Sequence, residues 1–249
     1  MPFSIPSRKR GRPPKTAAEK LRDRIWIHVV KLRSSLTTGY MLEKTVDTPQ
    51  VKRQKGMISR PRKWDRYLNW ERGPGQIKGK RNSVVLAEAE FPGTACWYHS
   101  PIWRALAPKP MTAEECETAL IRLDIDVAEL LFSIRSDAEH GNVEAHPFDQ
   151  ALADQLVATG SFDALAAAVV MVRWSEAIAS PAFRDLALKC YGRLQPAIAK
   201  LPEIEPFYEE LFSMIDNRCK HWVFIANNQR MDVVIFWEGI RDNVWKDKQ

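Results

Sequence analysis

The chain has 249 residues, of which 45% are hydrophobic and 27% are charged, so the composition excludes a wholly disordered protein. No stretch has the roughly 18–20 consecutive apolar residues that a membrane span needs. The net charge of +6 hides a division: residues 1–81 contain 22 Lys and Arg against 6 Asp and Glu, whereas residues 82–249 contain 15 against 25. Such asymmetry is typical of a nucleic-acid-binding segment joined to a different kind of domain.

The first residues are basic and rich in proline and contain no apolar run, so no secretory signal is expected. The four cysteines are Cys96, Cys116, Cys190 and Cys219. Because they are widely spaced in a chain too long to need disulfides, we interpret them as reduced thiols of a cytosolic protein. Neither a metal nor a cofactor is expected. The predicted location is the cytoplasm, in association with nucleic acid, or the nucleus if the source is eukaryotic.

A basic arm is predicted over residues 1–15. From residue 7 it reads Ser-Arg-Lys-Arg-Gly-Arg-Pro-Pro-Lys. Gly11 lets the backbone lie deep in a groove, and Arg10 and Arg12 on either side can follow the groove floor. The prolines that follow keep the chain extended, and narrow A·T minor grooves attract inserted arginines.

This run resembles an AT-hook, a short minor-groove-binding segment whose core is Arg-Gly-Arg-Pro. The resemblance covers about nine residues and implies that Arg10, Gly11 and Arg12 lie in an A·T-rich groove while Lys9 and Lys15 contact phosphates. The position before the first arginine, usually proline, is Lys9 here. The alternative is an unstructured basic tail that aids solubility or targeting.

Residues 16–74 are predicted to form a small basic helical region. Thr16 and Glu19 have the spacing of a capping box. The apolar residues that follow define one helical face, made of Leu21, Ile25, Val29, Leu32 and Leu36, with Trp26 and His28 off it. Short helices are expected over residues 39–44 and around Trp64, and the second should end by Gly73.

The order of these helices resembles a helix-turn-helix module, although residues 45–63 replace the tight turn of that family with a long basic segment. The candidate DNA contacts here are Lys52, Arg53, Lys55, Arg60, Arg62, Lys63 and Arg66. Trp64, Tyr67 and Trp70 lie among these cations, where aromatic rings can stack on unpaired bases. The alternative is that these three rings pack together inside a small irregular fold.

A linker is predicted over residues 75–82, followed by an acidic helical domain over residues 83–249. Helices are expected over residues 110–139, 148–159, 162–178, 181–200, around 207–215, and 231–245; residues 83–90 could be a strand or a helix. The segment 164–172 is almost uniformly apolar, which favours a central helix over a dimer interface. Short loops between periodic segments indicate a bundle, so the predicted fold class is mainly α.

The acidic domain contains no sequence motif of a common catalytic class. Arg135 and His140 resemble the Arg-x4-6-His pattern of HEPN-type helical ribonucleases, which implies that His140 would act as acid or base and Arg135 would hold the phosphate. The alternative is that both residues favour a helix C-terminus. An acidic patch at Glu203, Glu205, Glu209 and Glu210 is interpreted as a solvated surface.

Together these patterns predict a non-enzymatic DNA-binding protein, a regulator or mobile-element accessory factor with an A·T-biased arm. Double-stranded DNA is the expected partner. Residues 83–249 would form homo-oligomers or bind a protein partner, and no membrane association is expected. The alternatives are a HEPN-like ribonuclease or toxin that uses Arg135 and His140, and an RNA-binding scaffold subunit of a larger complex.

Overall fold

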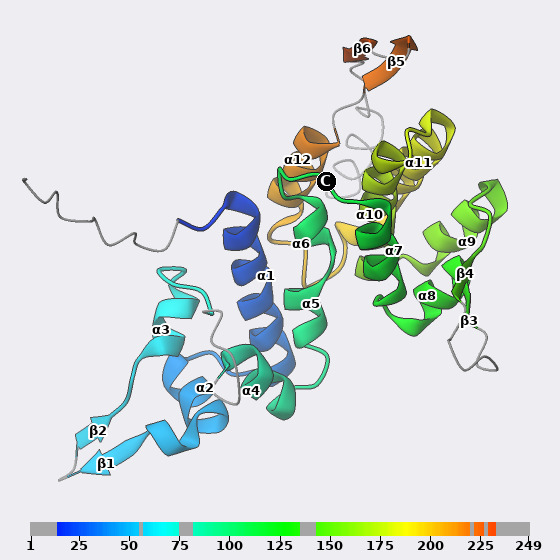
Figure 1. Cartoon of the computed structure of the whole chain (residues 1–249). Coiled ribbons are helices and arrows are strands. Elements are labelled where there is room, and N and C mark those ends of the chain that lie inside the picture. The colour runs from blue at the N-terminus through cyan, green and yellow to red at the C-terminus, as the bar shows by residue number, and fades with distance from the viewer. Residues whose placement is uncertain are drawn as a thin grey trace, which may run out of the picture.

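The computed structural model describes residues 14–54, 57–74, 82–134, 143–219, 222–226 and 229–232. It is mainly helical, which confirms the predicted fold class (Figure 1). The first part of the chain forms α1 (Ala17–Ser34), α2 (Gly39–Val46), the short 3-10 helix η1 (Thr48–Gln50), β1 (Lys52–Gln54), β2 (Met57–Ser59) and α3 (Lys63–Leu68). An antiparallel hairpin, β1–β2, therefore occupies part of the long basic segment over residues 45–63.

The rest of the chain continues with helices and two further hairpins. Its helices are α4 (Ser83–Glu90), α5 (Ala95–His99), α6 (Ile102–Ala105), α7 (Ala113–Ile121), α8 (Ile125–Leu131), α9 (Gln150–Thr159), α10 (Phe162–Ala177), α11 (Pro181–Ile198) and α12 (Tyr208–Arg218). Its strands are β3 (Phe132–Ile134), β4 (Val143–Ala145), β5 (Trp222–Ala226) and β6 (Gln229–Asp232). Each hairpin is an isolated antiparallel pair.

Helix α1 begins where the sequence predicts. The Thr16 side chain accepts a hydrogen bond from the Glu19 backbone at 3.2 Å, and the Glu19 carboxylate accepts one from the Thr16 backbone at 2.8 Å. These two bonds satisfy N–H groups that have no partner within the helix. The helix ends at Ser35, whose backbone is left-handed.

Two faces of α1 are buried, rather than the single face that the spacing predicts. Leu21, Ile25 and Val29 pack into the large core of the molecule. Trp26 lies off the predicted stripe but is fully buried in a second, smaller cluster, whereas Leu32 is 42% exposed. Figure 1 shows the reason: α1 runs through the middle of the molecule, with α2 and α3 on one side and α12 on another.

The smaller cluster is built around aromatic rings. The ring of Trp26 lies 5.9 Å from that of Trp64 and 5.8 Å from that of Tyr98, and Trp64 lies 5.5 Å from Tyr67. Because Tyr98 and α4 belong to the segment that follows residue 82, both predicted regions contribute to this cluster. The predicted division at residues 75–82 stays a prediction, since most of that linker lies outside the described residues.

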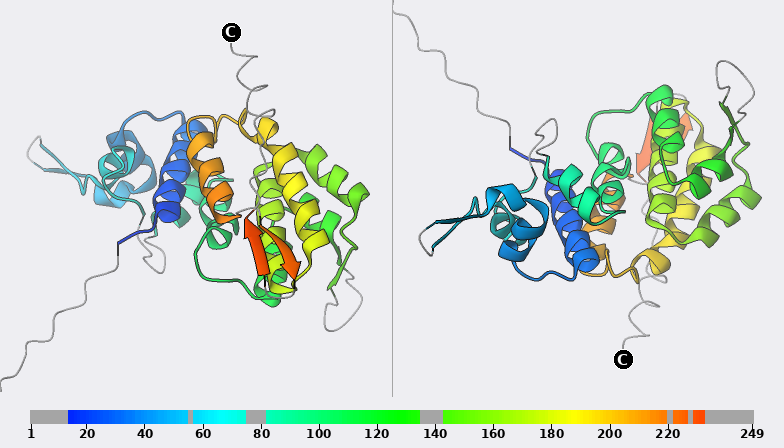
Figure 2. Two further views of the ribbon diagram at one scale, coloured as in Figure 1. Left: turned by 90° about the horizontal axis from the view of Figure 1, so that it is seen from above. Right: turned by 90° about the horizontal axis from the view of Figure 1, so that it is seen from below.

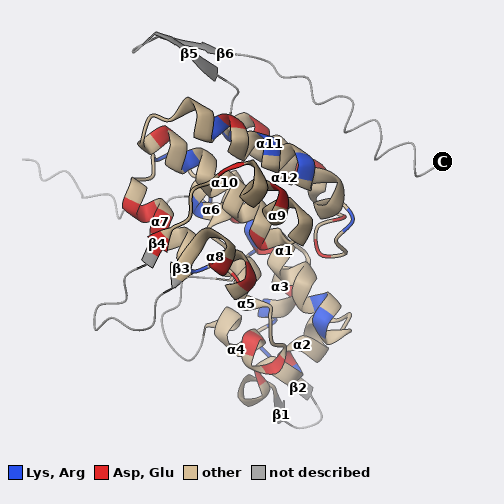
Figure 3. Ribbon diagram, turned by 90° about the vertical axis from the view of Figure 1, so that its right-hand side faces the viewer, with Lys and Arg blue, Asp and Glu red and all other residues tan. Residues whose placement is uncertain are grey.

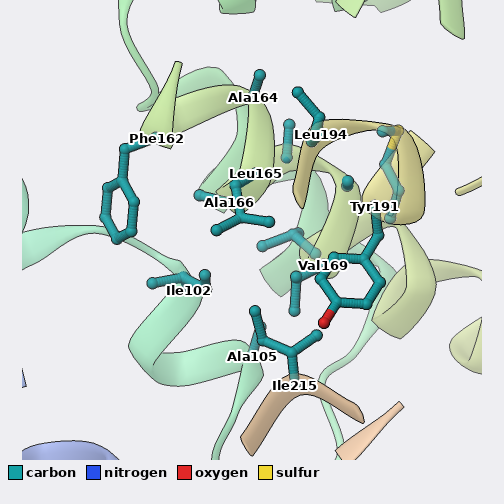
Figure 4. Packing of buried hydrophobic residues seen from close by; sticks show 14 of the residues in the cluster. Ile102, Ala105, Phe162, Ala164, Leu165, Ala166, Val169, Tyr191, Leu194 and Ile215 are labelled. Carbon is teal, nitrogen blue, oxygen red and sulfur yellow. The ribbon is translucent and has the colours of Figure 1, made fainter. Parts of the chain in front are cut away.

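The large core surrounds α10. Residues 164–172 are all buried within this single chain, which confirms the prediction of a central helix. Helix α11 packs along α10, and the small side chains of α10 allow the two helices to approach closely (Figure 4). Seen from above and below, α8, α9 and the β3–β4 hairpin lie at the opposite end of the molecule from α2 and α3 (Figure 2).

The prediction of one long helix over residues 110–139 is wrong. Helix α7 stops at Ile121, and the Asp124 side chain then accepts a hydrogen bond from the Asp126 backbone at 3.1 Å and starts α8. Phe132 leaves the helix to pair with Ala145 in the β3–β4 hairpin. Residues 83–90 are the helix α4, capped by Asn82. Most of the predicted final helix, residues 231–245, lies outside the described residues.

Candidate nucleic-acid interface

Several of the residues predicted to contact DNA are not among the residues that the structure describes. The candidate contacts Lys9, Arg10, Gly11, Arg12 and Lys55 are not among the described residues. Lys52 and Arg53 belong to strand β1, but the structure does not describe their side chains. The remaining candidates, at the root of the arm and around α3, are described and fall into two groups.

The first group, Arg60 and Lys63, points into the protein. Arg60 donates to the carboxylate of Glu43 at 2.8 Å and to that of Asp65 at 2.6 Å. Lys63 donates to Asp47 at 2.8 Å. Glu43 is fully buried, and a buried carboxylate needs a cation or hydrogen-bond donors as partners. Two of the predicted DNA contacts therefore neutralise acidic residues of α2 and its C-terminal end.

These acidic residues also position α3. Its N-cap residue, Arg62, is left-handed and makes no side-chain capping bond. Instead, Glu43 accepts a hydrogen bond from the Trp64 backbone at 3.3 Å, and Asp47 accepts one from the Trp64 indole at 2.6 Å. A carboxylate from α2 therefore caps the first turn of α3, where negative charge is favoured.

The second group consists of Arg62 and Arg66, which are exposed. Lys20 and Arg72 are also exposed although they were not among the predicted contacts, and we call these four residues the exposed cation row. The Arg66 backbone donates to the carbonyl of Arg62 one turn earlier, and the Arg72 backbone donates to the carbonyl of Arg66 at 3.2 Å. Arg72 and Lys20 line one surface hollow of about 480 Å³. No side-chain partner is recorded for these four cations within the described part of the chain. Figure 3 shows Lys and Arg in blue along α3.

Lys15 connects the arm to this row. Its ammonium group pairs with the carboxylate of Asp23 and donates to the carbonyl of Pro74 at 3.4 Å. Lys15 also lines the hollow that contains Lys20 and Arg72. Burial raises the pKa of Asp23, although Lys15 and Arg22 oppose that shift. The point at which the arm leaves the folded part is therefore fixed beside the exposed cation row.

The structure separates the three aromatic residues of this segment. Trp64 and Tyr67 pack in the small cluster, as the alternative interpretation holds. Trp70 is 59% exposed and lines the hollow with Lys20 and Arg72. Trp70 is therefore the one exposed ring of the three, whereas Tyr67 borders the same hollow but is buried.

The predicted acidic patch contacts α1. Glu210 accepts a hydrogen bond from Arg24 at 2.7 Å, and Glu203 lies 3.6 Å from Arg33. The His28 ring nitrogen Nε2 lies 3.0 Å from the Pro202 carbonyl oxygen. The patch is therefore partly an intramolecular interface, in which it pairs with two cations of α1.

The ribonuclease candidates Arg135 and His140 lie outside the described residues. Near them in the sequence, the structure contains a pair that the sequence did not predict: Ser133 Oγ lies 2.7 Å from His146 Nε2, and His146 Nδ1 lies 2.9 Å from the Leu130 carbonyl oxygen. Because a carbonyl only accepts, Nδ1 holds the proton and the Ser133 hydroxyl donates to Nε2. Their separation of 13 residues is not a recognisable motif, and the pairing depends on the β3–β4 hairpin.

We interpret these two hydrogen bonds as structural: through His146 they hold the β3–β4 hairpin against the end of α8. Replacing Ser133 with alanine should lower the unfolding free energy by about 1 kcal/mol, since it removes one partly buried hydrogen bond. Urea denaturation would measure the change. Ser213→Ala is the matched control, because that hydroxyl is exposed, and it should change stability by less than about 0.5 kcal/mol. Equal effects of the two substitutions would contradict the structural role.

The four cysteines are free, and three of them are buried. Burial raises the pKa of Cys219 to about 12 and that of Cys116 to about 11, so both remain protonated thiols at neutral pH. Among the described residues, no group of three His, Cys, Asp or Glu side chains is arranged to bind a metal ion. No helix in the described part of the chain is both long and apolar enough to cross a membrane.

Comparison with known proteins yields no family model, no curated protein and no solved structure that matches this chain.

Proposed function

We propose that this chain is a non-enzymatic DNA-binding protein, a regulator or mobile-element accessory factor. In this proposal the arm enters an A·T-rich minor groove while the exposed cation row contacts the phosphates of the same duplex. The helical region over residues 83–249 would form oligomers or bind a protein partner. The supporting observation is the attachment of Lys15 to Asp23 and Pro74, which places the root of the arm beside Lys20 and Arg72.

The expected salt dependence of DNA binding follows from the number of Lys and Arg side chains that have no acidic partner. Arg60 and Lys63 are paired with buried acids, so they are poor candidates for phosphate contacts. Four exposed cations would give a salt slope of about −3.6, at roughly 0.9 per phosphate on B-DNA. Cations of the arm would add to this slope. Binding should therefore weaken steeply as the salt concentration rises.

Replacing Arg10 and Arg12 together with alanine should remove the preference for A·T-rich duplex, since both side chains would leave the groove floor. The salt slope should fall by about 1.8, and affinity should fall about tenfold or more. Fluorescence anisotropy on A·T-rich and G·C-rich duplexes of equal length would measure both.

The charge-matched control is Lys189→Ala with Lys200→Ala, which removes two exposed cations outside the interface. It should leave binding nearly unchanged. Identical binding curves for the arm variant and the wild type would exclude the proposed role of the arm. RNA that outcompetes the A·T-rich duplex at equal salt would instead favour the RNA-binding alternative.

A further inference from the structure

The exposed side chain of Trp70 is unusual for its backbone conformation. Trp70 has a φ of 58°, in the left-handed region that bulky residues rarely adopt. It follows Asn69, the residue that ends α3, at a position that glycine usually occupies. Glycine here would remove the strain. The tryptophan side chain is therefore not explained by the requirements of the local backbone.

Burial does not explain the side chain either. At 59%, Trp70 is the most exposed of the large hydrophobic residues in the described part of the chain. Tryptophan is enriched at interfaces, where its apolar ring and its polar N–H can both find partners. A strained, exposed aromatic residue beside cations is the kind of feature that occurs at binding sites.

The indole ring is nevertheless held in place. The guanidinium group of Arg24 lies over the Trp70 ring at 4.9 Å from its centre. The aromatic ring of Phe207 lies 6.4 Å from the Trp70 ring, at an interplanar angle of 64°. Arg24 is itself fixed by its bond to Glu210 at 2.7 Å. The ring therefore has a defined orientation, and ligand binding would need little further ordering of this side chain.

The surroundings of the ring suit a nucleotide. The hollow of about 480 Å³ beside Trp70 is within the usual size range of small-ligand sites. The acidic residues Asp23 and Glu210 of the hollow are paired with Lys15 and Arg24. Lys20 and Arg72 therefore remain available to bind phosphates. Among the described lining residues, Glu71 is the one acidic side chain that forms no ion pair.

We propose that Trp70 stacks on an unpaired DNA base whose neighbouring phosphates lie against Lys20 and Arg72. This inference rests on the proposed function and makes it more specific. Because the arm would hold duplex and Trp70 would hold an unpaired base, the preferred ligand is a junction between double-stranded and single-stranded DNA. Aromatic stacking tolerates any base, since every base has a π-face. Trp70 would thus recognise DNA structure rather than sequence.

The test compares one A·T-rich duplex with and without a short single-stranded overhang, with the full chain and fluorescence anisotropy as the readout. Wild type should bind the overhang duplex about tenfold more tightly than the blunt one, the usual contribution of one stacked base. Trp70→Gly should lose this preference while keeping its affinity for blunt duplex. Glycine adopts the left-handed backbone freely, so this variant should fold.

Further variants separate stacking from charge. Trp70→Phe should keep part of the preference, and the salt slope should stay unchanged in both Trp70 variants. Lys20→Gln with Arg72→Gln should lower the salt slope by about 1.4 to 1.8. Ile125→Ala is the matched control, because Ile125 is 56% exposed but lies on α8, far along the chain. It should bind both ligands as wild type does.

The outcomes are distinguishable. If wild type binds blunt and overhang duplexes equally, or if Trp70→Gly keeps the preference, the stacking inference is overturned while DNA binding stands. If wild type binds neither ligand, the proposed function itself fails.

Discussion

Replacing Glu43 with alanine is expected to lower the unfolding free energy by about 3–5 kcal/mol, the usual effect of removing one partner from a buried ion pair. The Glu43 carboxylate is fully buried and accepts hydrogen bonds from Arg60 and from the Trp64 backbone. Without it, Arg60 keeps only Asp65, and the first turn of α3 loses its cap. Chemical denaturation monitored by circular dichroism would measure the loss.

Two further variants test the cause of that loss. Glu43→Met with Arg60→Met removes both charges and keeps apolar volume, so it should regain much of the stability. Glu90→Ala removes an exposed glutamate and should change stability by less than about 0.5 kcal/mol. A loss at Glu43 no larger than at Glu90 would contradict the capping role. The double methionine variant should also bind duplex with nearly the wild-type salt slope, because Arg60 is already paired.

Features with short-range causes could be predicted from the sequence. The Thr16–Glu19 and Thr112–Glu115 capping boxes depend on residues three positions apart, and both are present. The buried position of α10 follows from an apolar segment with no polar face. The capping boxes depend on hydrogen bonds between residues that are close in sequence. Residues 164–172 of α10 are apolar on all sides, so their sequence alone requires a buried position.

Features with long-range causes could not be predicted. Trp26 is buried because α1 lies between two cores, and one sequence stripe does not reveal a second partner. Arg60 and Lys63 look like their exposed neighbours in sequence, and only the fold of α2 against α3 brings Glu43 and Asp47 to them. Counting cations therefore overestimates the number of cations in this segment that have no acidic partner.

Pairing between α2 and α3 thus bears on the proposed DNA binding. It pairs two partly exposed cations with acidic residues, and it fixes the helix that contains Arg66 and begins after Arg62. The position of the exposed cation row relative to Lys15 depends on this packing. A substitution that separates the two helices should consequently affect both stability and DNA binding.

Gly39, the first residue of α2, is where such a substitution should act most strongly. A Cβ atom there would lie 2.2 Å from Asp65 Oδ1 and 2.6 Å from the Asp65 backbone nitrogen, so α3 itself would have to move. Gly39→Ala should lower the unfolding free energy by about 3 kcal/mol, whereas alanine normally stabilises a helix relative to glycine by about 1 kcal/mol. Unchanged or raised stability in urea denaturation would show that the helices are not in close contact.

A second substitution locates the clash. Asp65→Ala in the Gly39→Ala background removes the carboxylate oxygen at 2.2 Å but leaves the backbone contact at 2.6 Å. It also removes the bond from Arg60 to Asp65, so it should restore only part of the lost stability. Full restoration would mean that the side chain alone was in the way. Since α3 must shift in the single variant, Arg62 and Arg66 should move relative to Lys20 and Arg72. The salt slope on duplex DNA should then fall by about 1 to 2, with the protein still folded under the conditions of the binding measurement.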